Sequence, residues 1–394
     1  MWQQEIERKI DRLLNDVDFI KNRVSTYLGR NEALTYLVDE TPIFVNTDDF
    51  GCPLNFLNGG RYEEEYFMVL LSFRKPGVTF LDIGANLGVY TLRMGSYLRH
   101  GTIIAFEPIE NIRNLFSRSV FLNGFNNIVT IHPYALSDND GEAVLNIPEG
   151  HAGGSSLSDD VGVGETVQVK KLDNLVDEGF ICHLVKLDVE GHEFHVLRGM
   201  RRVMEHSPEC VLMFEKLATN SGIESSIIEY TESLRWSIYH IQLTKLIKCN
   251  SSTFCNAGGY FIAGRSEVIE KDGLDRAFVD IYPDDLNILA GKISEGIMHG
   301  SARLPKGTVI FHGPYWFLYR GYYRLTIDGE IDGVFDLEVT ERFGFKVLGF
   351  EVKSGSLMME FPIYRDLCKF ELVLRSRDAH STIRLNKIRM ARLG

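Results

Sequence analysis

Short apolar runs alternate with amphipathic stretches through the middle of the chain. Five apolar runs have the length and composition of buried strands: Val78–Ile83, Thr102–Phe106, Ile128–His132, Leu184–Leu187 and Cys210–Phe214. Stretches with a helical spacing of apolar residues lie between most of them, such as Tyr90–Arg99, Ile112–Asn123 and Phe194–Glu205. This alternation predicts an α/β domain over residues 40–268, in which a mainly parallel sheet carries helices on both faces.

Two further segments of this domain have patterns of their own. Trp236–Ile241 and Gly259–Ala263 are short and apolar, and we expect them to close the sheet as a final hairpin. Residues 150–164, GHAGGSSLSDDVGVG, are rich in glycine and serine and cannot form a core element. They predict either a flexible loop beside a functional site or a plain surface excursion.

The pattern changes near residue 300. Residues 284–300 show a helical stripe with a cap at Asp284 or Asp285 and an end at Gly300, and its apolar members are Leu286, Leu289, Ile293 and Ile297. We therefore expect a helical linker over residues 269–302. Beyond it, apolar and polar residues alternate, for example at 323–328, 335–339 and 370–374. Residues 303–394 are predicted to form a small all-β sandwich of jelly-roll type.

The N-terminal segment shows a heptad repeat. Its apolar residues are separated by steps of four and three, at Ile6, Ile10, Leu13, Val17, Ile20, Val24 and Tyr27. β-Branched residues at the a positions favour a parallel coiled coil of few strands. So short a repeat also fits an amphipathic helix that packs on its own domain. We expect residues 1–30 to form a helix that joins copies of the chain into a homo-oligomer, with Gly29 and Asn31 as its stop signal.

Composition and charge exclude several classes of protein. The 394 residues are 44% hydrophobic and 24% charged, as in ordinary globular proteins, and the net charge is −12. An acidic chain binds phosphate backbones poorly, so we expect no nucleic acid partner. The scattered cysteines contain no CxxC pair and indicate reduced thiols in a cytoplasmic protein. The charged N-terminus argues against a signal peptide, and the lack of a long apolar run argues against a transmembrane segment.

The first predicted strand runs into a glycine turn, Asp82-Ile-Gly84-Ala-Asn86-Leu-Gly88. Gly84 and Gly88 would let the backbone pass close to a ligand. The dinucleotide fingerprint GxGxxG is built for a pyrophosphate, whereas here a carboxylate precedes the first glycine. Asp82 suits a cationic ligand better, such as the ammonium group of S-adenosylmethionine. The next strand ends at Glu107, where an acidic side chain can accept hydrogen bonds from both hydroxyls of a ribose.

A second polar group follows the fourth strand, in Asp188-Val-Glu190-Gly-His192-Glu193. Ligands of open α/β sheets bind at the carboxyl ends of the strands, and Glu215 ends the fifth strand at the same edge. Glu190 and Glu193 also fit a simpler role, because a helix N-terminus stabilises carboxylates. Asp188 and its neighbours could hold a divalent cation, but no ligand spacing requires one, so we predict no metal.

Together these segments resemble FkbM-type S-adenosylmethionine-dependent methyltransferases. The matching segments are Leu81–Gly88, Ala105–Pro108, Ala135–Asp138, Gly154–Leu157, Val185–Glu193 and Val196–Gly199, and the resemblance covers roughly residues 60–265. It implies a Rossmann-like class I methyltransferase sheet of seven strands, with methyl transfer to a hydroxyl of a sugar or a polyketide. It also implies that Asp82, Gly84, Asn86 and Gly88 line the methionine end of the cofactor, that Glu107 holds the ribose, and that Ala135 lies near the adenine.

The C-terminal segment has a weaker resemblance. Gly313–Leu318 and Gly321–Leu325 look like parts of the small β-sandwich domains attached to bacterial polysaccharide-modifying enzymes. The aromatic residues there could stack on sugar rings or fill the core of the sandwich, and they are Tyr315, Trp316, Tyr319, Tyr322 and Tyr323. The sandwich is therefore expected either to bind glycans or to have a structural role.

The expected function is O-methylation of a sugar hydroxyl in a bacterial cell-surface polysaccharide or its precursor. Such an enzyme would be cytoplasmic or peripheral at the inner face of the membrane. Glu190 or His192 would accept the hydroxyl proton, while Asp188 would position the acceptor or the cofactor. Three alternatives stay open: a polyketide-type acceptor, a nicotinamide-dependent oxidoreductase on the same fold, and a non-catalytic glycan-binding or assembly protein.

Overall fold

The chain folds as two compact units. The computed structural model describes Lys9 and residues 24–158, 164–216, 223–300, 308–341, 345–353, 358–377 and 382–393. One unit contains Asn22–Gly95 and Gly101–Arg276, and the other is chiefly Ala277–Gly394. The expected N-terminal coiled coil lies outside the described residues, apart from Lys9 and its last positions.

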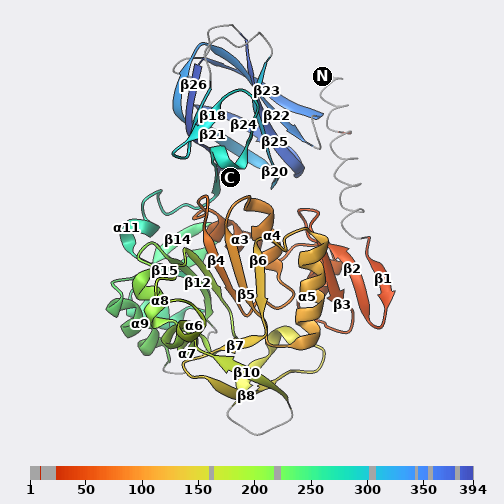
Figure 1. The fold of residues 1–394 in the computed structure, drawn as a ribbon, viewed down its shortest axis with the longest axis vertical. Coiled ribbons are helices and arrows are strands. Elements are labelled where there is room, and N and C mark those ends of the chain that lie inside the picture. Colours follow the sequence, from red (N-terminus) through yellow and green to blue (C-terminus); the bar gives the residue numbers. More distant parts are fainter. Residues whose placement is uncertain are drawn as a thin grey trace. The chain divides into compact units, whose positions relative to one another are not determined.

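A central sheet organises the first unit (Figure 1). Its strands are β4 (Thr79–Ile83), β5 (Thr102–Phe106), β6 (Val129–His132), β11 (Leu184–Leu187), β12 (Val211–Lys216), β13 (Ser237–Gln242), β14 (Lys245–Lys248) and β15 (Gly259–Gly264). They lie in the order β14-β13-β15-β12-β11-β4-β5-β6, and β15 is antiparallel to both of its neighbours. The predicted sheet is confirmed, and the two strands expected to close it, β13 and β15, do pair antiparallel. Within the described residues β14 is one strand more than expected, and it forms the hairpin with β13.

Helices cover both faces of this sheet. They include α4 (Val89–Tyr97), α5 (Glu110–Leu122), α7 (Glu193–Gly199), α8 (Arg201–His206) and α9 (Ile223–Ser233). The strands β5 and β6 lie on one side of β4, and β11 and β12 lie on the other. Right-handed crossovers therefore place α4 and α5 on the face opposite to α7 and α8. The predicted helix over 194–205 is interrupted at Met200, which separates α7 from α8.

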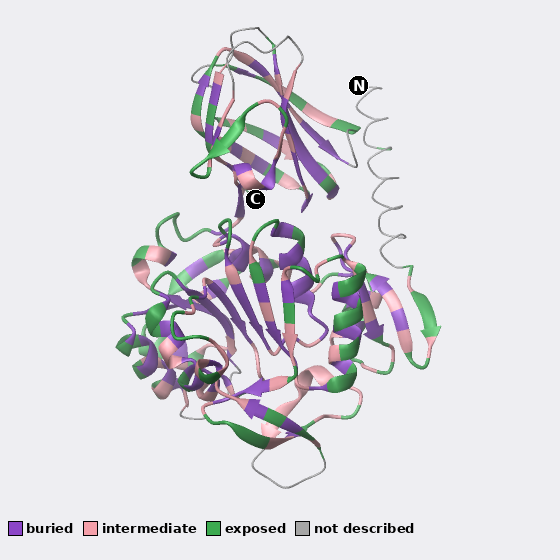
Figure 2. Cartoon of the chain, in the orientation of Figure 1, coloured by how far each residue is buried: buried purple, intermediate pink, exposed green. Residues whose placement is uncertain are grey.

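The core of the first unit lies between the sheet and these helices. Leu81, Val185 and Leu212 of the sheet pack in one cluster with Leu197 of α7 and Ile227 of α9. Figure 2 shows these strands as buried along most of their length. None of the helices in the described ranges is both long enough and apolar enough to cross a membrane.

Smaller elements surround the sheet. A small antiparallel sheet contains β1 (Thr26–Gly29), β2 (Glu32–Tyr36) and β3 (Pro42–Asn46), and another small sheet contains β7 (Tyr134–Leu136), β8 (Gly141–Asn146), β9 (Ser156–Ser158) and β10 (Glu165–Lys170). Short helices complete the unit: α2 (Cys52–Leu57), α3 (Glu64–Leu71), η1 (Ala152–Gly154), α6 (Leu172–Leu175), α10 (Ser251–Asn256) and α11 (Ser266–Ile269). All six cysteines are free thiols, as expected.

The N-terminal prediction is wrong at its end. The expected helix would reach residue 28, but Thr26–Gly29 forms β1, and Tyr27 is therefore in a strand. Arg30 and Asn31 have φ values of 54° and 60°, as in the tight turn of a β-hairpin. The signal that we interpreted as a helix stop is the turn between β1 and β2.

The second unit is a β-sandwich, as predicted. One sheet contains β16 (Phe278–Ile281), β18 (Lys292–Ser294), β19 (Ile297–His299), β21 (Gly321–Asp332), β24 (Met358–Ile363) and β26 (Thr382–Arg392). The other contains β17 (Asn287–Ile288), β20 (Val309–Leu318), β22 (Val334–Glu341), β23 (Phe345–Lys353) and β25 (Leu367–Ser376). Alternate side chains such as Leu325, Leu337 and Leu372 fill the space between the two sheets.

The helical linker predicted over 269–302, with its helix at 284–300, is wrong. After α11, residues 283–285 form a short 3₁₀ helix, η2 (Pro283–Asp285), and β17, β18 and β19 follow. Glu295 and Gly296 both have positive φ, at 53° and 73°, and form the turn of the β18–β19 hairpin. Because β16 and β19 pair with β26, this region belongs to the sandwich, and the two units divide after Arg276 rather than near residue 300.

Most of the aromatic residues proposed for sugar stacking are buried. Trp316, Tyr319 and Tyr323 are buried, whereas Tyr322 is 44% exposed. The hydroxyl of Tyr323 donates a hydrogen bond to the carbonyl of Tyr319 over 2.7 Å, which fixes both residues in place. Three of the five aromatic residues therefore have a structural role.

Candidate active site

The loop after β4 is shaped by two glycines with positive φ. Gly84 has a φ of 72°, and a Cβ atom there would lie 1.9 Å from the carbonyl oxygen of Asp188. Only glycine allows β4 to end so close to the end of β11. Gly88 has a φ of 81°, and a Cβ atom there would lie 2.0 Å from the ring of Phe116 in α5. Gly84 therefore brings two strand ends together, and Gly88 serves the packing of α4 on α5.

Glu107 fixes the conformation of this loop from the end of β5. One carboxylate oxygen accepts a hydrogen bond from the backbone N–H of Asn86, and the other accepts one from the N–H of Ile109, each over 2.8 Å. Burial raises the pKa of Glu107 to about 7, although both hydrogen bonds oppose the shift. Each oxygen keeps a further lone pair, so the side chain can also accept hydrogen bonds from two hydroxyls of a ligand.

A cavity of about 240 Å³ lies at the carboxyl ends of β4, β5 and β11. Seven of the nine predicted site residues line it, namely Gly84, Asn86, Glu107, Ala135, Asp188, Glu190 and His192. One part of its wall is apolar and is formed by residues such as Phe106, Ile109, Ala135 and Leu145. The cavity thus joins an apolar part, a carboxylate at Glu107 and a group of acidic residues at β11.

Two predicted cofactor residues, Asp82 and Gly88, do not line this cavity. Asp82 is completely buried, and one of its oxygens accepts hydrogen bonds from the N–H and the hydroxyl of Thr91, over 3.0 and 2.7 Å. This carboxylate fixes the first turn of α4 relative to β4. It supports the glycine loop through its contact with α4, without lining the cavity itself.

The glycine-rich segment after residue 150 lies beside the site. His151, Ala152, Gly153, Ser155 and Leu157 line the cavity. The backbone N–H of Phe50 donates to the carbonyl of Gly150 over 2.7 Å, and the N–H of Ala152 donates to Asp49 over 3.3 Å. Of the two interpretations open from the sequence, the geometry supports a loop beside a functional site.

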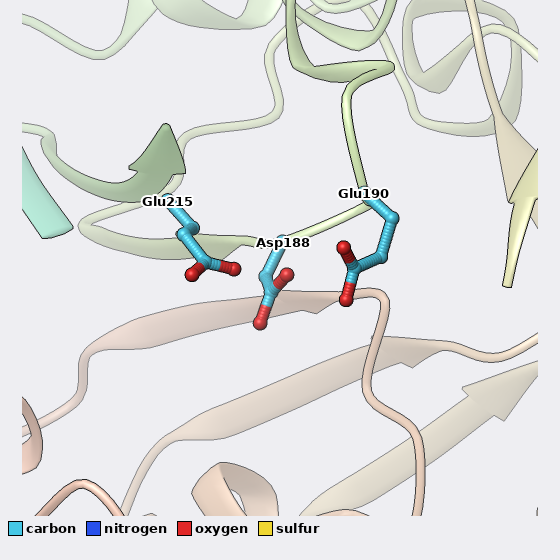
Figure 3. Close-up of side chains that lie close together, drawn as sticks. All are labelled: Asp188, Glu190 and Glu215. Carbon is cyan, nitrogen blue, oxygen red and sulfur yellow. The ribbon is translucent and has the colours of Figure 1, made fainter. Parts of the chain in front are cut away.

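Three carboxylates meet at the other end of the cavity: Asp188 and Glu190 after β11, and Glu215 near the end of β12 (Figure 3). One oxygen of each lies within 4.8 Å of the others. Burial and then repulsion by Asp188 and Glu190 raise the pKa of Glu215 to about 8. Burial and the charge of Asp188 also raise the pKa of Glu190. Carboxylates at this spacing could accept a proton from a ligand or hold a divalent cation.

Lys186 compensates part of this negative charge, and the sequence prediction missed it. It lies on β11, it is buried, and its ammonium group lies 3.2 Å from Asp188 and donates to the carbonyl of Gly84 over 2.9 Å. Burial alone lowers the pKa of Lys186, but the charges of Asp188, Asp82 and Glu63 outweigh it and raise the pKa. Lys186 thus connects the glycine loop to the acidic end of β11.

A chain of hydrogen bonds leads from Tyr90 to Asp188 through residues that the sequence did not indicate. Tyr90 donates to one oxygen of Glu63 over 2.9 Å. The hydroxyl of Tyr260 lies 3.1 Å from the other oxygen of Glu63 and 3.0 Å from Asp188. A phenol has one proton, so one of these two contacts needs a protonated carboxyl group. Burial raises the pKa of Glu63, and we assign this proton to Glu63.

His192 lies at the N-terminus of α7, where its ring is held on two sides. Its Nε2 atom is 2.8 Å from the hydroxyl of Ser137, and its ring stacks on His195 with centroids 4.5 Å apart. The side chain lines the cavity beside Glu190. It is therefore placed to exchange a proton with a bound molecule, if Ser137 leaves one ring nitrogen available.

The strand order and the position of the cavity define the class of the first unit, which is a Rossmann-like methyltransferase sheet. Residues 82–236 match the model of the Methyltransferase FkbM domain. The central part of the chain is thus a methyltransferase domain of FkbM type, as the sequence motifs predicted.

Two curated proteins are similar to this part of the chain. Methyltransferase 1 of Beauveria bassiana is 28% identical over 149 residues, which is 32% of this chain and 59% of that protein. Hexuronic acid methyltransferase AglP of Haloferax volcanii is 27% identical over 150 residues, which is 37% of this chain and 59% of that protein. The chain thus spans 59% of the length of each of these relatives.

Solved methyltransferase structures are also similar at a low level. The SAM-dependent methyltransferase from Agrobacterium tumefaciens is 11% identical and has a TM-score of 0.34. The match covers 61% of this chain and 71% of that chain. The fold assignment rests on the strand order above.

Proposed function

We propose that this protein is an S-adenosylmethionine-dependent O-methyltransferase that acts on a sugar hydroxyl, in a cell-surface polysaccharide or its precursor. The observation that carries this proposal is the single cavity that Gly84, Glu107 and the acidic group at β11 line together. The match to the FkbM domain supports the reaction. The relative that is named for a hexuronic acid supports a sugar as the acceptor.

The residues of the cavity fit the cofactor. Glu107 has lone pairs left for two ribose hydroxyls, and the apolar wall near Ala135 and Leu145 suits an adenine ring. Gly84 lines the cavity, and its lack of a side chain lets its backbone lie against the carbonyl of Asp188. When bound, S-adenosylmethionine supplies an electrophilic methyl group.

The chain itself must orient the acceptor and remove its proton. Alignment of the reacting atoms contributes about 7–11 kcal/mol in well-oriented reactions, and a general base adds about 10²–10⁴-fold. Glu190 is half-buried at the cavity, and its raised pKa makes its carboxylate a stronger base than an exposed one. We propose Glu190 as the base, with His192 as the alternative, and Asp188 as the group that orients the acceptor.

Binding and turnover test this proposal separately. Calorimetry with S-adenosylhomocysteine and with NAD distinguishes a methyltransferase from an oxidoreductase. Labelled cofactor and a panel of cell-surface glycans then identify the acceptor, and mass spectrometry locates the methyl group. Binding of NAD alone, or no binding of S-adenosylhomocysteine at millimolar concentration, would contradict the proposal.

Two variants test the assignment of the base. Glu190→Gln and His192→Ala are compared with the native chain and with Glu178→Gln, which changes an exposed carboxylate outside the cavity. We expect Glu190→Gln to lower turnover by about 10²–10⁴-fold while the affinity for S-adenosylhomocysteine is kept. Full turnover in both cavity variants would rule out both residues as the base.

A further inference from the structure

The end of the cavity at β11 and β12 is the part most remote from Glu107. The strand order β12-β11-β4-β5 places Glu215 on one side of β4 and Glu107 on the other. If Glu107 holds the ribose, as the proposed function requires, then the acceptor enters on the side of Glu215. The inference below rests on that proposed function.

The charged groups at this end of the cavity are mainly negative. The carboxylates of Asp188, Glu190 and Glu215 line it, together with Glu63, which holds the proton assigned to it above. Among the described residues that line the cavity, Lys186 is the only lysine or arginine. It is buried, and it is already held by Asp188 over 3.2 Å and by the carbonyl of Gly84 over 2.9 Å. A carboxylate on the acceptor would find no free permanent cation here.

Hydroxyl and amino groups suit the same surroundings. Both can donate hydrogen bonds to the oxygens of Glu190 and Glu215, and an ammonium group also gains from their charge.

We infer that Glu215 is a specificity-determining residue that excludes acceptors with a carboxylate near the reacting hydroxyl. The acceptor is then a neutral sugar or an amino sugar, and a uronic acid is a poor one. The chemistry of the acceptor would thus differ from that in the name of the relative from Haloferax volcanii.

Three matched pools of methyl glycosides test this inference: common neutral hexosides, the corresponding hexosaminides and the corresponding hexuronides. The assay measures transfer from labelled S-adenosylmethionine at about pH 9, above the ordinary pKa of an imidazole. With the native chain, we expect the rate for the hexuronide pool to be at least about 100-fold lower than the best of the other two.

Replacing the acidic group tests the role of the residue itself. Glu215→Gln should raise the ratio of the hexuronide rate to the neutral rate by about tenfold, because it removes a charge and keeps the shape. Glu178→Gln removes an exposed charge outside the cavity and should leave the ratio unchanged. The ratio is independent of how much active protein each preparation contains.

The outcomes separate this inference from the proposed function. A hexuronide rate equal to or above the neutral rate, or an unchanged ratio in Glu215→Gln, would overturn the inference alone. No turnover with any pool, while S-adenosylhomocysteine still binds, would overturn the sugar acceptor and the inference with it. Failure to bind S-adenosylhomocysteine would overturn the proposed function.

Discussion

Replacing Glu107 by glutamine tests how the cofactor is held. In the protein, the two oxygens of Glu107 accept hydrogen bonds from the N–H groups of Asn86 and Ile109, each over 2.8 Å. Glutamine has one oxygen and one amide NH₂ group. One of the two backbone N–H groups would therefore face a donor, and one ribose hydroxyl would lose its acceptor.

The size of the effect follows from these contacts. A hydrogen bond to a charged group contributes about 1.5–3 kcal/mol, and an unpaired buried donor costs about 1–3 kcal/mol. We expect Glu107→Gln to lose about 3 kcal/mol of binding free energy, which corresponds to about 100-fold weaker binding of S-adenosylhomocysteine. Glu110→Gln is the control, because Glu110 is exposed in the first turn of α5 and does not line the cavity.

Proton release gives a second measurement of the same contact. The pKa of Glu107 is about 7 in the free protein. Ribose hydroxyls that donate to Glu107 favour its charged form, so binding should release about 0.9 protons at about pH 6 and about 0.1 at about pH 8. Calorimetry in buffers of different ionisation enthalpy measures this number. Unchanged affinity in Glu107→Gln, or the same proton release from that variant, would refute the assignment of Glu107 to the ribose.

Three further predictions concern the scaffold of the site. Gly84→Ala would place a Cβ atom 1.9 Å from the carbonyl of Asp188 at a φ of 72°. We expect this variant to lose about 3 kcal/mol of the free energy of unfolding, which lowers Tm by about 6–12 °C. Gly179→Ala is the control and should change Tm little, because its Cβ atom would meet no atom within 4 Å. Lys186→Met should lower the free energy of unfolding by about 3–5 kcal/mol, because the partly buried carboxylate of Asp188 loses its partner, and adding Asp188→Asn should restore part of this loss in denaturant titrations. Burial raises the pKa of Glu193 to about 7, so the folded state holds this proton more tightly than the unfolded state, and this contribution to stability is complete below about pH 4.5 and is lost as the pH rises through about 7. Glu193→Gln should remove this dependence of the free energy of unfolding on pH between about pH 4.5 and 7. An unchanged dependence in the variant would contradict the raised pKa of Glu193.

The α/β unit could be predicted because its periodicity and its burial agree. β4, β5 and β11 are buried on both faces and appear in the sequence as continuous apolar runs. Parallel strands bring their carboxyl ends to one edge, so motifs about 80 or 100 residues apart were expected to meet there. Glu107 and Asp188 do line one cavity.

The helix predicted at 284–300 shows where periodicity fails. Its stripe is not one buried face, because Leu286 is 4% exposed while Leu289 is 62% exposed and Ile293 is 38% exposed. The turn at Glu295 and Gly296 and the pairing of β19 with β26 determine the local structure instead. Pairing with a strand that lies about 90 residues later in the chain cannot be recognised from a local pattern of apolar residues.

The acidic end of the cavity could be predicted only in part, for a similar reason. Asp188 and Glu190 follow a strand and were expected at the edge of the sheet. Glu63 precedes α3, and Tyr260 lies on β15, so neither stands next to a glycine turn or another motif. They meet Asp188 only because β15 and α3 come to the same edge in the folded chain, which is a tertiary contact without a local signal.

Asp82 suggested a cationic ligand in the sequence, but in the structure it faces a different cation. Asp82 and Lys186 are directly opposite each other in the register of β4 and β11, and the charge of Lys186 lowers the pKa of Asp82 against the effect of its burial. The cation that Asp82 faces is thus a lysine of its own chain. The ammonium group of Lys186 also lies 3.2 Å from Asp188, which follows β11, so Asp82 and Asp188 both act on the same cation. The carboxylates left to act on a bound cofactor or acceptor are therefore those that line the cavity, with Glu107 at one end and Asp188, Glu190 and Glu215 at the other.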